Sequence, residues 1–269
     1  MAEDTEVLRE VWNGRVPVCF RLDPHELSTI EEPEPYFLLL PRMSYLPLVT
    51  DKVKMHFKNA VRFDDGDEMW FEFDDQPLKW QHPIGLLFDL HGNPEQLPWS
   101  ITVHFKRFPE DSIIRCPGDD AVESLFMSTV KEADFLKHRG AVMNAMHAKE
   151  HRQIWTGLKN DRFEHFWEMN NRLMTTADAP FRSIPYRIHQ ADKPFIQEPI
   201  KPNTVDDTPN SLGDLIQERV PHAFPNESGE SSYRILIQGI EPPLTTPLQY
   251  LSKHFSHPDN FLHIAVVSR

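Results

Sequence analysis

The order in which strand-like and helix-like patterns follow one another constrains this chain more than any other feature. In the first part, patterns typical of strands and helices occur at 15–22 (strand), 36–41 (strand), 48–61 (helix), 69–73 (strand), 83–91 (short helix) and 100–105 (strand). The run at 36–41 is apolar throughout and predicts a buried strand. A short amphipathic helix is expected before them, at 4–12. This order is that of a β-grasp fold, in which one helix packs across a small mixed sheet.

The last third of the chain repeats the same order. Its predicted elements are at 183–189 (strand), 194–200 (strand), 211–220 (helix), 233–240 (strand), 247–255 (short helix) and 261–267 (strand). Ser211 is expected to cap the longer helix, with Asp214 three residues later as a variant capping box. The stretches "PIGLLFDLHGNPEQLPWSITVHF" and "PLQYLSKHFSHPDNFLHIAVV" share a proline, a helix, a polar loop and a closing strand, which indicates a weak internal repeat.

Between the two repeats lies a proline-poor stretch that reads as helices. The expected helices are at 119–139, 141–159 and 161–174, the last with Asp161 as N-cap. We therefore predict an α+β protein of three domains, at 1–110, 117–176 and 180–269. The first and last are β-grasp domains, and they flank a helix-rich domain.

Charge and composition exclude several classes of protein. The net charge of −13 argues against a protein that tracks nucleic-acid phosphates. No apolar run approaches the roughly 20 residues that span a bilayer, and the N-terminus lacks the pattern of a signal peptide. The 2 cysteines do not form a disulfide framework. We expect a soluble cytoplasmic protein that needs no cofactor and no metal.

One short motif leaves an enzymatic alternative open. "HAKEH", from His147 to His151, matches H-x-x-E-H, in which two histidines one helical turn apart bind zinc and a glutamate acts as base. A zinc hydrolase using His147, Glu150 and His151 is therefore the first alternative function. The downstream sequence offers no obvious third ligand, and a chance match is unremarkable in a chain with 14 histidines.

A second alternative is a conjugating enzyme that forms a thioester on Cys116. Its neighbours in "IIRCPGDD" supply one arginine but also two acids, so no lowered thiol pKa follows from the sequence. Cys19 lies inside an alternating strand pattern and is expected in the core. The dinucleotide-binding, P-loop and nucleophile-elbow motifs are all absent from the sequence.

Lys131 has unusual neighbours on the predicted helix 119–139. At about 100° per residue, the residues expected to face the core are Val122, Leu125, Phe126, Ala133 and Leu136. Lys131 lies opposite them, with Met127 one turn before it and Phe135 one turn after it. A solvated lysine between two apolar side chains suits a surface that another protein covers. The alternative is that the flanking domains of the chain itself bury this side of the helix.

Several long stretches of the chain resemble the autophagy protein five family. They are "VLREVWNGRVPVCF", "PYFLLLPRMSYLPLVTDKVKMHF", "PLKWQHPIGLLFDL", "FMSTVKEADFLKH", "NDRFEHFW" and "GIEPPLTTPLQYLSKHFSHPDNFLHIAVV". The resemblance covers nearly the whole length. It implies two ubiquitin-like domains flanking a helix-rich domain, which is the arrangement predicted above.

The resemblance also implies a function without catalysis. A lysine of the helical domain, Lys131 by its position in "MSTVKEADFLKH", receives the C-terminal glycine of the ubiquitin-like autophagy protein twelve. A conjugating enzyme acts transiently, and a helix of autophagy protein sixteen binds non-covalently between the domains. The conjugate then acts as a ligase-like scaffold at the phagophore membrane, promoting attachment of an Atg8-type modifier to phosphatidylethanolamine. That Met127 and Phe135 form the modifier-docking surface is our inference and is not implied by the family.

Overall fold

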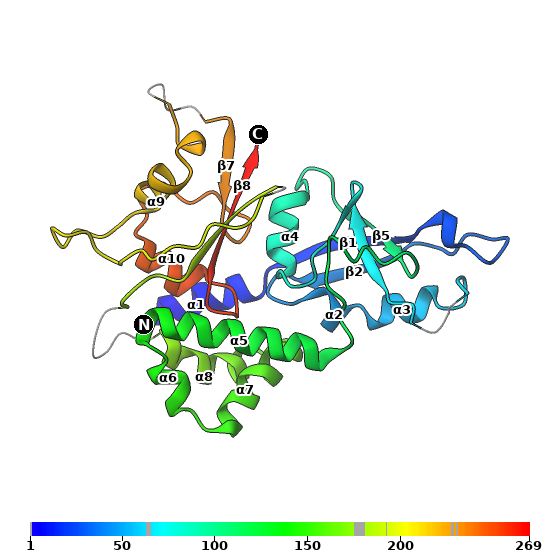
Figure 1. Cartoon of the computed structure of the whole chain (residues 1–269), viewed down its shortest axis with the longest axis horizontal. Helices are drawn as coiled ribbons and strands as arrows, with labels where there is room; N and C mark the ends of the chain where they lie inside the picture. Colours follow the sequence, from blue (N-terminus) through cyan, green and yellow to red (C-terminus); the bar gives the residue numbers. More distant parts are fainter. Residues whose placement is uncertain (1, 63–65, 175–180, 192, 227–228, 230) are drawn as a thin grey trace. The chain divides into compact units, whose positions relative to one another are not determined.

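The computed structural model describes residues 2–62, 66–174, 181–191, 193–226, 229 and 231–269 (Figure 1). Its elements form two compact units. One unit is Gly14–Ser124, and the other joins Met1–Asn13 to Leu125–Arg269. Each unit is described separately below.

The unit Gly14–Ser124 is built on a 5-stranded sheet of order β2-β1-β5-β3-β4. Its elements are β1 (Arg15–Leu22), β2 (Tyr36–Pro41), α2 (Leu46–Val49), α3 (Asp51–Phe57), β3 (Trp70–Phe73), β4 (Gln76–Pro77), α4 (Ile84–His91), β5 (Trp99–His104) and the 3-10 turn η1 (Pro24–Glu26). The first and last strands, β1 and β5, run parallel, and Phe20 pairs with Ile101 in their register. Both side chains lie in the core of the unit. The predicted β-grasp order is confirmed here.

Two predictions for this unit are wrong. Strand β2 is at the edge of the sheet, so only β1 pairs with it, and Phe37 and Leu39 remain 61% and 64% exposed. A continuous apolar run therefore does not mark a buried strand here, because alternate side chains point away from the core. The single helix expected at 48–61 is two helices. They meet at Thr50, whose hydroxyl donates a hydrogen bond to the carbonyl of Leu46 and closes the first of them.

The second sheet has 3 strands in the order β6-β8-β7. Its elements are β6 (Tyr186–Gln190), α9 (Leu212–Arg219), η2 (Pro221–Ala223), β7 (Tyr233–Leu236), α10 (Leu248–Phe255) and β8 (Leu262–Ser268). The closing strand β8 is again parallel to the first strand of its sheet, as β5 is in the other unit. The predicted capping box is confirmed. The backbone N–H of Asp214 donates to Ser211 Oγ, and the N–H of Ser211 donates to the Asp214 carboxylate.

Two strand predictions in this half are also wrong. The segment 194–200 forms no strand: it makes an isolated bridge between Ile196 and Ile188, and the Ile200 carbonyl accepts a hydrogen bond from the N–H of Ile184 at 2.8 Å. It contains Pro194 and Pro199, neither of which can donate a ladder hydrogen bond. The strand expected at 233–240 ends at Leu236. Gln238 and Gly239 then adopt positive φ values of 53° and 81° in a turn.

Five further helices complete the described part of the chain (Figure 1). They are α1 (Ala2–Trp12), α5 (Asp119–His138), α6 (Ala141–Ala145), α7 (Ala148–Lys159) and α8 (Phe163–Met174). Four of them, α1, α6, α7 and α8, lie wholly in the unit that contains the second sheet. Helix α1 packs against α10, and Trp12 contacts the ring of Phe166 with centroids 4.9 Å apart.

Two helix predictions require correction. The helix expected at 141–159 is interrupted, because Met146 is extended and α7 begins after it. Asp161 has a φ of 51° and precedes α8 by two residues, so it is not the N-cap. The predicted domain limits at 176 and 180 lie outside the described residues, and the three sets of domain boundaries stay a prediction.

Candidate functional site

Helix α5 carries the candidate acceptor lysine, and its sequence explains why it forms. Asp119 and Asp120 stand in its first turn, and Lys137 and His138 in its last, so both ends complement the helix dipole. The residues that it buries recur at helical spacing and are Val122, Phe126, Val130, Ala133, Asp134 and Lys137. Leu125 and Leu136, predicted to face the core, are only partly buried.

The structure places Lys131 on the open face of α5. Lys131 is exposed, Phe135 is 63% exposed and Met127 is half-buried. Among the described residues, none forms a hydrogen bond or ion pair with the Lys131 ammonium group. The amine is therefore free to reach a reactant that comes from solvent, with an apolar side chain one turn away on either side.

A polar contact next to Lys131 ties α5 to the second sheet. Glu132 accepts hydrogen bonds from the Arg187 guanidinium at 3.0 Å and from Gln197 Nε2 at 2.6 Å. The same guanidinium lies over the rings of Phe261 and Phe195, at 4.0 and 4.9 Å from their centroids. This contact fixes the position of the turn that carries Lys131. Sequence reasoning missed it, since its members are far apart along the chain.

Lys137, on the same helix, has the opposite environment. It is only 1% exposed, and its Nζ donates to Asn260 Oδ1 at 2.7 Å and to the Leu173 carbonyl at 3.1 Å. Burial lowers the pKa of Lys137 to about 7, and the carboxylates of Asp134 and Asp259 oppose that shift. Its amine is largely shielded from any partner in solution. Lys137 is therefore a structural residue, and no pattern in the sequence distinguished it from an ordinary helix-end lysine.

The predicted zinc motif is not assembled as a metal site. His147 precedes α7 as its N-cap residue, and its backbone N–H donates to Glu150 at 2.7 Å. Glu150 also accepts from Arg172 at 2.6 Å, and these two contacts hold the pKa of the carboxyl below its usual range. A His151 ring nitrogen lies 3.1 Å from the Met143 carbonyl. Glu150 thus caps the start of α7 and pairs with Arg172 of α8. In the described part of the chain, His147, Glu150 and His151 do not gather into a cluster of metal ligands.

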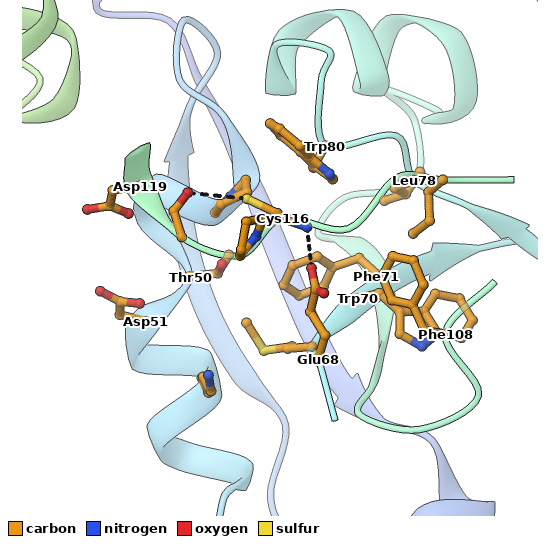
Figure 2. A pocket seen from close by; sticks show the side chains of 16 residues that line it. Thr50, Asp51, Glu68, Trp70, Phe71, Leu78, Trp80, Phe108, Cys116 and Asp119 are labelled. Atoms are coloured by element: carbon orange, nitrogen blue, oxygen red, sulfur yellow. Dashed lines mark hydrogen bonds between the residues drawn. The ribbon is translucent and has the colours of Figure 1, made fainter. Parts of the chain in front are cut away.

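Cys116 lies at the wall of a pocket of about 180 Å³ in the unit Gly14–Ser124 (Figure 2). Aromatic side chains, among them Trp70, Trp80 and Phe108, form much of its lining. Figure 2 shows the Glu68 carboxylate accepting a hydrogen bond from the backbone N–H of Cys116. Burial and the nearby carboxylates of Glu68 and Asp119 raise the pKa of the thiol. A thioester-forming cysteine needs the reverse, a lowered pKa, so this environment does not support the conjugating-enzyme alternative.

Family models match the chain in three consecutive parts. They are "Autophagy protein ATG5, UblA domain" at residues 11–105, "Autophagy protein ATG5, alpha-helical bundle region" at 119–176 and "Autophagy protein ATG5, UblB domain" at 183–266. The chain belongs to the autophagy protein 5 family. The resemblance inferred from the sequence is thereby confirmed, as is the fold of two ubiquitin-like domains flanking a helix-rich region.

Individual relatives agree with this assignment to the autophagy protein 5 family. The chain is 41% identical to Autophagy protein 5 of Drosophila melanogaster, over 99% of this chain and 98% of that protein. It is 31% identical to Autophagy-related protein 5 of Caenorhabditis elegans, over 98% of each. The crystal structure of Kluyveromyces marxianus Atg5 shares the fold, with a TM-score of 0.81 over 98% of this chain and 100% of that one at 18% identity.

Family membership supports a role in autophagy for a chain with two ubiquitin-like domains. In the described part of the chain, no helix combines the length and the apolar character that crossing a bilayer requires. The roles of Lys131, Met127 and Phe135 stay predictions.

Proposed function

We propose that this member of the autophagy protein 5 family is a non-catalytic acceptor and scaffold in autophagosome formation. Lys131 receives the C-terminal glycine of autophagy protein twelve in an isopeptide bond. The conjugate, with autophagy protein sixteen, then promotes transfer of an Atg8-type modifier onto phosphatidylethanolamine. The observation that carries the proposal is an exposed lysine without a partner among the described residues, placed beside the exposed ring of Phe135.

The proposed chemistry is aminolysis of a thioester. Lys131 Nζ, once deprotonated, attacks the carbonyl carbon of the glycine thioester held on the conjugating enzyme. The new C–N bond replaces the C–S bond, and the enzyme's cysteine leaves as a thiolate that takes up a proton. No carboxylate or histidine among the described residues forms a hydrogen bond or ion pair with Lys131, so the base is assigned to the conjugating enzyme, which binds only transiently.

Met127 and Phe135 are proposed as the surface on which the attached modifier rests. Their spacing of one turn on either side of Lys131 brings the apolar contact close to the covalent bond. The isopeptide bond holds the modifier close to the exposed ring of Phe135, so the effective concentration of the modifier at this surface is high. The surface therefore does not need high affinity for the free modifier.

The remaining parts of the proposal rest on family membership and charge. Autophagy protein sixteen is the non-covalent partner, and the protein acts in the cytoplasm and at the phagophore membrane. The net charge of −13 disfavours direct attraction to an anionic leaflet, so we assign membrane contact to the assembled complex.

The test is a reducing denaturing gel of the protein from its own cells, with Lys131→Arg and Lys149→Arg alongside. Lys149 is also exposed and lies in helix α7, which makes it a matched control. We expect a thiol-resistant band, heavier by one modifier, in the wild type and in Lys149→Arg, and none in Lys131→Arg. Arginine keeps the positive charge at an exposed position, so the fold should be unchanged.

A conjugate that persists in Lys131→Arg would place the acceptor elsewhere. A heavier band that thiol removes would instead indicate a thioester on a cysteine. For the docking surface, Phe135→Ala should slow conjugation in a reconstituted reaction. Met55→Ala, which removes a similarly exposed side chain (65%) from helix α3, should not.

A further inference from the structure

A buried imidazole stands among three carboxylates at the end of strand β5. His104 is the last residue of β5, and its side chain is 10% exposed. Asp23 follows β1, Glu26 ends the 3-10 turn η1, and Glu72 lies in β3. All four residues belong to the unit Gly14–Ser124. They come together because β5 pairs with β1 on one side and with β3 on the other.

The distances within this group match those of a metal site. His104 Nδ1 lies 3.3 Å from Asp23 Oδ2 and 3.5 Å from Glu26 Oε1, and the three ligand atoms lie within 4.8 Å of one another. Tetrahedral zinc binds imidazole nitrogen at about 2.0–2.1 Å and carboxylate oxygen at about 2.0–2.2 Å, so its ligand atoms lie about 3.3–3.6 Å apart. Two of the three separations therefore already have the length that zinc requires.

The ion pairs within the cluster leave its negative charge only partly compensated. In the described part of the chain, neither ring nitrogen of His104 makes a hydrogen bond, and Nε2 is fully buried without one. No lysine or arginine of the described residues pairs with Asp23, Glu26 or Glu72. Even a protonated imidazole would leave two negative charges in a largely buried group. Burying uncompensated negative charge is energetically costly, and a bound divalent cation would neutralise these two charges.

The ligands are held in place by contacts that a metal would leave intact. The two Glu26 oxygens accept hydrogen bonds from the backbone N–H groups of Phe105 and Lys106, at 2.7 and 3.1 Å. Asp23 Oδ1 accepts from the N–H of His25, which leaves Oδ2 directed at His104. The cluster is thus positioned before any ion arrives.

The imidazole itself is fixed from its other side. The His104 ring stacks on Trp70, with centroids 4.0 Å apart and an angle of 11° between the planes. Its Nε2 faces Glu72 Oε1 at 3.6 Å. In metal sites, a carboxylate on the second ring nitrogen orients the histidine and raises its basicity. Glu72 is in the place for that role.

We propose that Asp23, Glu26 and His104 Nδ1 bind one divalent transition-metal ion, with zinc as the best fit, and that Glu72 is a positioning residue for His104. Imidazole nitrogen selects zinc and its neighbours over magnesium or calcium, which prefer oxygen ligands alone. Three protein ligands leave a fourth position for water or for an oxygen of a partner. The ion joins the loop after β1 to the end of β5, the two strands that run parallel in this sheet. This differs from the expectation, drawn from the sequence, that the chain needs no metal.

The experiment is a calorimetric zinc titration of the full chain after removal of bound metal by a chelator, repeated with cobalt, whose absorption spectrum reports its ligands. Variants Asp23→Asn, His104→Asn and Glu72→Gln are compared with the wild type. His151→Ala is the control, since it disrupts the "HAKEH" histidines and leaves the cluster intact. Circular dichroism of each metal-free variant checks that it is folded.

We expect about one zinc ion per wild-type chain, a cobalt spectrum of four-coordinate type, and a melting temperature that rises on adding zinc. Asp23→Asn and His104→Asn should lose binding, Glu72→Gln should bind about 10–100-fold more weakly, and His151→Ala should bind as the wild type does. Absence of zinc binding by the wild type would overturn the proposal. Binding that survives in Asp23→Asn and His104→Asn but is lost in His151→Ala would also overturn it. Should His104→Asn fail to fold, Asp23→Asn decides, because its half-buried side chain is replaced by one of equal size.

Discussion

The buried amine of Lys137 should make stability depend on pH in a way that one substitution removes. Lys137→Met keeps the length and the apolar stem of the side chain while deleting the ammonium group. Asn260 and the Leu173 carbonyl each lose a hydrogen-bond donor in this variant. The difference in stability at a single pH therefore mixes several effects. The pH dependence of this difference between wild type and variant reports the titration of Lys137, because the loss of the hydrogen bonds changes the free energy of unfolding by the same amount at every pH.

The size and sign of that change follow from the pKa values. Burial lowers the pKa of Lys137 from 10.5 to about 7 in the folded protein. Below about pH 7, Lys137 is protonated in both the folded and the unfolded chain. Between pH 7 and 10.5, Lys137 is protonated mainly in the unfolded chain, so the free energy of unfolding rises with pH. The slope approaches about 1.4 kcal/mol per pH unit. Between pH 7 and pH 9, the wild type should gain about 2 kcal/mol relative to Lys137→Met.

The assay is urea unfolding at pH 7, 8 and 9, followed by far-ultraviolet circular dichroism. Ile184→Val is the control, because Ile184 is 1% exposed and its truncation should cost about 0.5–1.5 kcal/mol without removing a titrating group. The stability of this control should run parallel to the wild type as pH changes. If Lys137→Met also runs parallel to the wild type, Lys137 keeps an ordinary pKa in the folded protein and the reasoning fails.

Two further predictions concern packing and thiol chemistry. Gly157→Ala should destabilise the protein by about 1–3 kcal/mol in urea unfolding, because an added Cβ would lie 2.6 Å from the backbone nitrogen of Phe166. The control is Ser128→Ala, at an exposed position of α5, which should change stability by less than about 0.5 kcal/mol. Equal effects of Gly157→Ala and Ser128→Ala would contradict the close approach of α7 and α8. Cys116 should react with iodoacetamide at pH 8 more slowly than free cysteine does, because burial and two carboxylates raise the pKa of its thiol. Mass spectrometry of the modified peptide measures the rate. A rate equal to that of free cysteine would refute the raised pKa.

Local signals in the sequence were sufficient to predict the order of most elements and one helix cap. Ser211 and Asp214 are three residues apart, so their reciprocal hydrogen bonds depend on nothing beyond one turn of chain. Periodicity could not say which strand would lie at an edge. The position of β2 depends on its pairing with β1 alone, and for that reason Phe37 is exposed despite its apolar neighbours.

The features of the candidate sites that sequence reasoning missed depend on contacts between distant residues. Asp23 and Glu26 meet His104 because Leu22 pairs with Val103 where β1 and β5 run side by side. A histidine and two acids separated by almost a whole domain carry no spacing signal of the kind that zinc motifs have. The "HAKEH" segment has such spacing, yet it became a helix start, because Glu150 binds the backbone of His147 and the side chain of Arg172.

The two lysines of α5 differ in exposure and in basicity, and the acceptor role proposed for Lys131 rests on its exposure. Lys137 has the lower pKa, about 7, so much of its amine is unprotonated near neutral pH. That amine is directed at Asn260 and the Leu173 carbonyl, and with 1% of the residue exposed a thioester cannot approach it. Lys131 lies six residues earlier on the open face, where a bound enzyme can deliver both the thioester and a base. On the proposed function, the surface around Lys131 is what makes it the acceptor, so changing that surface at Phe135 should affect conjugation without any change at the lysine itself.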